Sequence, residues 1–104
     1  MIVTPENMRA AYEFLLKISF KGLRLPPPAK ITFAAKRLKK YHGLYEYPEH
    51  IVTINTDTKS VTALLQIMAH EMIHVAFEQN AASDHDKHDA NFEAMARLVE
   101  HEMG

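Results

Sequence analysis

The sequence contains no cysteine, so disulfide bonds, thiolate zinc sites and cysteine nucleophiles are all excluded. It also lacks an excess of charge, since 12 Lys and Arg residues oppose 13 Asp and Glu residues. Overall charge therefore does not drive binding to nucleic acid or to an anionic membrane, and any such binding has to come from a local patch. Long apolar runs are lacking too, so we expect neither a secretion signal nor a membrane span, and an intracellular, cytoplasmic location fits.

What the sequence does contain is the composition of one soluble globular domain, with 47% apolar and 24% charged residues in a chain of 104. A chain of this length can bury a single hydrophobic core. We therefore expect one domain over residues 1–104, without a separate substrate domain. The unusual number is 7 histidines.

The first half of the sequence predicts a helix, a connector and a small sheet. Thr4-Pro5-Glu6 is typical of a helix start, and apolar residues at helical spacing follow it to an expected helix end near Lys21-Gly22. The prolines at 26–28 remove three amide donors in succession, which predicts a rigid connector without helix. Short β-prone runs at 31–33, 44–47 and 51–55 then predict a small antiparallel sheet.

The second half predicts two further helices. Asp57, Thr58 and Ser60 can cap a helix whose broad apolar surface should form the core of the domain. A polar stretch over 79–86 predicts a loop, and apolar residues over 92–103 recur at helical spacing. The order helix, small sheet, helix, helix is typical of an α+β domain.

The central helix contains His70-Glu71-Met72-Ile73-His74, a match to the pattern H-E-x-x-H. Residues four apart lie on one helical face about 5–6 Å apart at Cβ, so both imidazoles can bind one tetrahedral zinc ion. Glu71 can then act as general base on a water molecule. Because these polar side chains are costly to bury in an apolar helix, a metal ion is a fitting partner. The alternative is a structural helix whose histidines cap or line the core.

A catalytic zinc ion usually has three protein ligands, so one more is expected downstream. His88 lies four residues before Phe92 and shares its inward helical face, which makes it the predicted third ligand. Glu93 is a competitor, but as the next residue after Phe92 it is turned about 100° away from that inward face on an ideal helix. His101 lies about two and a half turns beyond Phe92, so it reaches back poorly to the start of the helix. His85 falls in a fraying first turn and is the main competitor.

Together, the segments His70-Glu71-Met72-Ile73-His74 and His88-Asp89-Ala90-Asn91-Phe92 resemble the signature of the SprT-like metalloprotease domain, which is HExxH followed by His-x-x-x-aromatic. The order of elements before the motif agrees, including a Gly-x-Tyr at 43–45. The resemblance implies a zincin-like α+β fold, one Zn²⁺ ion and an endopeptidase related to Spartan-type proteases, which cleave proteins crosslinked to DNA. Asp89 departs from the family pattern, which often has glycine there.

The expected function is therefore zinc-dependent hydrolysis of a protein or peptide substrate, with Glu71 taking a proton from water and passing it to the leaving amine. The strand at 51–55 is expected to add an extended substrate to the sheet. Two alternatives stay open. One is a non-catalytic zinc-stabilised module that binds DNA or protein, with a fourth ligand such as His85, and the other is a hydrolase of a non-peptide bond.

A basic cluster provides the argument for DNA as a partner. Lys36, Arg37, Lys39 and Lys40 occupy five positions just before Tyr41. Such a cluster beside an aromatic ring can follow a phosphate backbone and stack a base. The alternative is a solvated strand or turn surface, and membrane binding is not expected.

Overall fold

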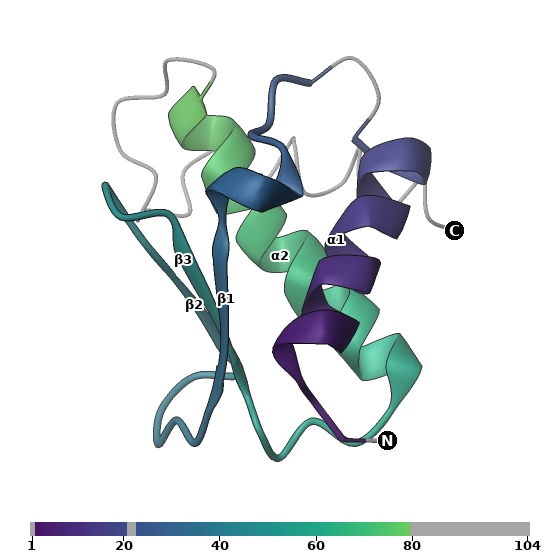
Figure 1. Cartoon of the computed structure of the whole chain (residues 1–104). Coiled ribbons are helices and arrows are strands. Elements are labelled where there is room, and N and C mark those ends of the chain that lie inside the picture. Colours follow the sequence, from purple (N-terminus) through teal and green to yellow (C-terminus); the bar gives the residue numbers. More distant parts are fainter. Residues whose placement is uncertain (1, 21–22, 80–104) are drawn as a thin grey trace.

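The computed structural model describes residues 2–20 and 23–79 and forms two layers (Figure 1). A three-stranded sheet makes one layer and both α-helices cover one of its faces. This arrangement agrees with the expected α+β class, while the expected C-terminal helix lies outside the described residues. The elements in chain order are α1 (Pro5–Ile18), the 3₁₀ helix η1 (Pro28–Lys30), β1 (Thr32–Lys36), β2 (Gly43–Glu46), β3 (Ile51–Asn55) and α2 (Val61–Gln79).

The sheet is mixed, so the prediction of an antiparallel sheet is wrong. β3 lies in the centre, where it pairs parallel with β1 and antiparallel with β2. The short connection between β2 and β3 permits only antiparallel pairing, whereas a long stretch of chain separates β1 from β3 and allows them to run in the same direction. Strand-forming residues do not encode this choice, because it depends on which strand takes the central place.

The central position of β3 also corrects the expected mode of substrate binding. Both edges of the strand at 51–55 are already paired, one with β1 and the other with β2. An extended peptide therefore cannot add to this strand. Within residues 2–20 and 23–79, the edge strands of the sheet are β1 and β2.

The first helix begins as predicted and ends earlier. Thr4 Oγ1 accepts a hydrogen bond of 3.1 Å from the Asn7 amide, and Pro5 occupies the first turn. The helix stops at Ile18 rather than near 21–22, and the chain then turns so that Phe20 is buried. The proline connector also differs from the expectation, since Pro28 starts a short 3₁₀ helix. Proline is tolerated at the first position of a helix, because the amide hydrogen that it lacks would have no acceptor within the helix.

The core lies between the two layers. α2 contacts α1 as well as β2 and β3, and α1 contacts β1. Ser60 provides the cap of α2, because its Oγ accepts a hydrogen bond of 3.1 Å from the Ala63 amide. Tyr12 of α1 meets Phe33 of β1 edge to face, with ring centroids 5.6 Å apart. Over residues 61–76, α2 contributes the buried apolar residues Leu64, Met68, Ala69, Met72, Ile73, Val75 and Ala76.

Val61 lies at the start of α2 and is 61% exposed, so it takes no part in the core. Neither α1 nor α2 has the length and apolar character needed to cross a membrane, a statement that covers the described residues only.

Candidate metal centre

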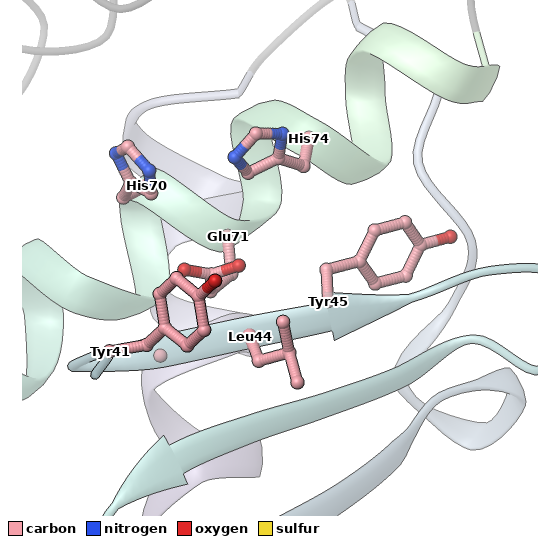
Figure 2. A pocket seen from close by; sticks show the side chains of 7 residues that line it. Tyr41, Leu44, Tyr45, His70, Glu71 and His74 are labelled. Atoms are coloured by element: carbon pink, nitrogen blue, oxygen red, sulfur yellow. The ribbon is translucent and has the colours of Figure 1, made fainter. Parts of the chain in front are cut away.

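A cavity of about 330 Å³ lies between α2 and β2, and it is built from both elements (Figure 2). The helix provides His70, Glu71 and His74. β2 and Tyr41, which lies two residues before the strand begins, provide the opposite wall. The residues on that wall are Tyr41, Gly43, Leu44 and Tyr45.

The two histidines lie on one face of α2, as their spacing predicts. Their ring centroids are 5.1 Å apart and the ring planes meet at 75°. Both side chains are half-buried and line the same cavity. Imidazole nitrogens are common zinc ligands, so this pair fits part of a tetrahedral zinc site.

Glu71 lies between the histidines and is only 4% exposed. Burial disfavours the charged form of its carboxyl group and raises its pKa to about 8 from an ordinary value of 4.5. A cation in the same cavity would offset this cost, because an opposite charge close by favours the carboxylate. The buried carboxyl group is therefore a second feature that fits a metal ion.

Gly43 brings the backbone of β2 unusually close to the helix. A Cβ atom at this position would lie 2.7 Å from Cγ2 of Ile67 and 3.0 Å from Oε2 of Glu71. Glycine is required here for close approach rather than for a special backbone angle. The Gly-x-Tyr pattern at 43–45 did not indicate this contact, because the contact joins residues far apart in the sequence.

The described residues do not by themselves complete a metal site. Across residues 2–20 and 23–79, no group of three or more His, Asp or Glu side chains is placed to hold a metal ion. The predicted third ligand His88 lies outside the described residues, as do His85, Glu93 and His101. The choice among these four therefore stays a prediction.

Of the basic cluster, Lys40 alone is found in a cavity wall next to the site. Lys36 ends β1, the other three residues follow in the connection to β2, and all four side chains are exposed. Lys40 also lines a second cavity, of about 350 Å³, together with Tyr41, Gly43 and Glu71. Both cavities are lined by Tyr41, Gly43, His70 and Glu71, so Lys40 is the residue of the cluster that lies nearest to the histidine pair along the cavity walls.

The tyrosines of this region have different environments. The hydroxyl of Tyr45 shares a hydrogen bond of 2.8 Å with Nδ1 of His50, and its ring extends away from the histidines in Figure 2. Tyr47 is 48% exposed and is absent from the walls of both cavities. Tyr41 lines both cavities. From the sequence, Tyr41 was considered only as a stacking partner for a base. Its position two residues before the Gly-x-Tyr pattern at 43–45 indicates that it lies close to the start of the strand beside the histidine motif.

Comparison with known proteins places the whole arrangement in one family. The sequence model of the SprT-like family matches residues 8–104, a segment that takes in most of α1, the sheet and α2. No curated protein shows significant similarity to the sequence. The resemblance carried by the two histidine segments is confirmed, and the chain belongs to the SprT-like family.

Proposed function

We propose that this protein is a zinc-dependent metallopeptidase. The observation that carries the proposal is the cavity in which His70, Glu71 and His74 of α2 face the strand β2. Membership of the SprT-like family supports a metallopeptidase-like domain. The two imidazoles would hold the zinc ion together with His88, the third ligand that we propose. When bound, zinc polarises the scissile carbonyl group and makes a water molecule more acidic.

Glu71 would act as the general base. Its carboxylate accepts a proton from the attacking water and later donates that proton to the leaving amine. The 4% exposure of Glu71 keeps bulk water away from the carboxyl group, so the proton stays at the reaction site. The contact between Gly43 and Glu71 limits where the carboxyl group can lie.

β2 would hold the substrate. In the described part of the chain, β2 pairs with β3 alone, so its outer edge offers unpaired backbone groups next to the cavity. An extended peptide can add to such an edge through main-chain hydrogen bonds, which give affinity with little sequence preference. β2 therefore replaces the strand at 51–55 as the proposed docking edge.

DNA-associated proteins are the substrate class that the basic cluster favours. Its four exposed side chains can contact phosphates, and Lys40 does so at the wall of the second cavity. A substrate protein attached to DNA would then be presented to the cavity by its DNA. The finding that supports this idea is Lys40, which belongs to both the cluster and the cavity wall.

Glu71→Gln in the full chain tests the proposed function. The amide keeps the shape of the side chain but cannot accept a proton, so zinc content measured by mass spectrometry should stay unchanged. Cleavage of an unfolded protein such as casein should fall by about 100-fold or more. Glu13→Gln, a change at an exposed position of α1 outside both cavity walls, is the matched control and should cleave normally.

Two results would contradict the proposal. Normal cleavage by zinc-loaded Glu71→Gln would remove Glu71 from the mechanism. A parent protein that binds zinc through four protein ligands, measured by X-ray absorption, and cleaves nothing would instead be a non-catalytic zinc-stabilised module.

A further inference from the structure

Tyr41 stands at the junction of the two cavities and has no role in the function proposed so far. Its side chain is 59% exposed and contributes to the walls of both cavities. In Figure 2 the ring rises beside Glu71, with the hydroxyl group at the end directed toward the cavity. A phenol hydroxyl group in this position is available to a molecule that occupies the site.

A buried side chain fixes the backbone of Tyr41. Asn55, at the end of β3, is 3% exposed, and its side-chain amide donates hydrogen bonds of 2.7 Å to the Leu38 carbonyl and 2.9 Å to the Tyr41 carbonyl. The backbone amide of Asn55 donates a third hydrogen bond, of 2.9 Å, to the His42 carbonyl. The core of the sheet therefore holds the segment that carries Tyr41.

The other side of this segment is fixed by α2. Gly43, two residues after Tyr41, lies so close to Ile67 and Glu71 that a single added carbon would clash. The backbone that carries Tyr41 is therefore held between a hydrogen-bonded anchor and a tight backbone contact, which limits where its hydroxyl group can reach. Groups that are held in place before the reaction stabilise developing charge effectively, because they need no reorganisation.

We propose that Tyr41 is a further catalytic residue whose hydroxyl group donates a hydrogen bond to the scissile carbonyl oxygen as negative charge develops on that oxygen. Asn55 is the positioning residue that holds Tyr41 in place. The proposal rests on the peptidase function. The proton stays on the phenol oxygen throughout, and Glu71 carries out the proton transfer.

The other three tyrosines are less suited than Tyr41 to donate a hydrogen bond to the scissile carbonyl oxygen. Tyr45 uses its hydroxyl group in the hydrogen bond with His50. Tyr12 is fully buried and donates a hydrogen bond of 2.6 Å to the Pro26 carbonyl. Tyr47 lies outside both cavity walls and so serves as the matched control.

Tyr41→Phe removes the hydroxyl group and keeps the ring. In the zinc-loaded protein, kcat for peptide cleavage should fall by roughly 100- to 1000-fold, the range found when one oxyanion donor is removed. KM should change by less than about threefold, because the hydrogen bond strengthens only as charge develops. Tyr47→Phe should leave both constants unchanged.

Binding provides a readout that does not depend on turnover. The affinity for a phosphinic peptide, which resembles the transition state, should fall in parallel with kcat/KM in Tyr41→Phe. Adding Tyr41→Phe to Glu71→Gln should leave the affinity for the intact substrate peptide unchanged. Asn55→Asp removes the amide donor and should lower kcat. Adding Tyr41→Phe to Asn55→Asp should then lower kcat by a smaller factor than Tyr41→Phe does in the parent protein.

Each result decides the question. An active parent with an equally active Tyr41→Phe variant would overturn the role of Tyr41 and leave the proposed function standing. A change confined to KM would assign the hydroxyl group to substrate binding and overturn the catalytic role. A parent that neither cleaves peptides nor binds the phosphinic peptide would overturn the proposed function, and this inference with it. If Asn55→Asp does not fold, the Tyr41→Phe comparison still decides the catalytic role.

Discussion

Gly43 and Glu71 touch so closely that a Cβ atom on the glycine would lie 3.0 Å from the carboxylate oxygen Oε2. The glycine starts β2 and the glutamate lies in the middle of α2, so this contact joins the two walls of the cavity. Position 43 therefore sets the distance between the edge on which we propose that substrate lies and the proposed general base.

Gly43→Ala should weaken both the fold and the activity. The added carbon would lie 2.7 Å from Cγ2 of Ile67, so the Ile67 side chain has to shift or the strand and the helix have to separate. Crowding of this kind costs about 1–3 kcal/mol in the free energy of unfolding, which chemical denaturation measures. Peptide cleavage should fall as Glu71 moves. Gly43→Ala should destabilise an Ile67→Ala variant less than it destabilises the parent protein. An equal loss of stability in both backgrounds would contradict the close approach of Gly43 to Ile67.

The stability of the metal-free protein should depend on the ionisation of Glu71. Burial raises the pKa of this group to about 8, so the folded protein keeps a proton that the unfolded chain loses near its ordinary value of 4.5. For a raised pKa, the stabilising contribution is complete below the unfolded value and is lost as pH rises through the folded value. The free energy of unfolding should therefore fall between about pH 5 and about pH 8, by up to about 1.4 kcal/mol per pH unit.

Glu71→Gln provides the control for this pH dependence, because glutamine does not titrate. Denaturation of both proteins in the presence of a chelator should show their stabilities diverging as pH rises, with the parent losing more. Parallel curves over this range would show that the pKa of Glu71 is close to its ordinary value in the folded state.

His88→Ala should release zinc much more readily than His85→Ala. The prediction rests on the position of His88 four residues before Phe92, which places both on one face if the segment is helical. Metal content after dialysis against a weak chelator, measured by mass spectrometry, distinguishes the variants. Loss of zinc from His85→Ala with retention in His88→Ala would make the ligand assignment wrong, together with the helical register from which it follows.

Replacing the four residues of the basic cluster by serine should weaken DNA binding and reduce its dependence on salt. Each phosphate contact that is lost should lower the slope of log K against log salt by about 0.9. Fluorescence anisotropy of a labelled oligonucleotide at several salt concentrations measures this slope. Serine at Lys17 and Lys30, which are exposed on other elements, is the control. A parent that binds no DNA at low salt would exclude DNA as a partner.

Local sequence patterns were sufficient to predict much of the framework of this protein. Thr4 and Ser60 begin their helices because their hydroxyl groups accept hydrogen bonds from amides within the next turn. His70 and His74 share a face of α2 because four residues span about one helical turn. These features depend on residues close in the chain, so the sequence alone determines them, and the two histidine segments also indicated the family.

The order of the strands and the walls of the cavity were decided by contacts between distant residues. β3 takes the central place in the sheet, and no pattern within residues 51–55 indicates its neighbours. Asn55 reaches back to the Leu38 and Tyr41 carbonyls, and Gly43 meets Glu71 across two elements. Such contacts form only when strand and helix pack together, because a buried amide needs partners and a close approach needs the absence of a side chain. The tertiary structure therefore decides where Tyr41 lies, although the sequence already contains the residues that hold it there.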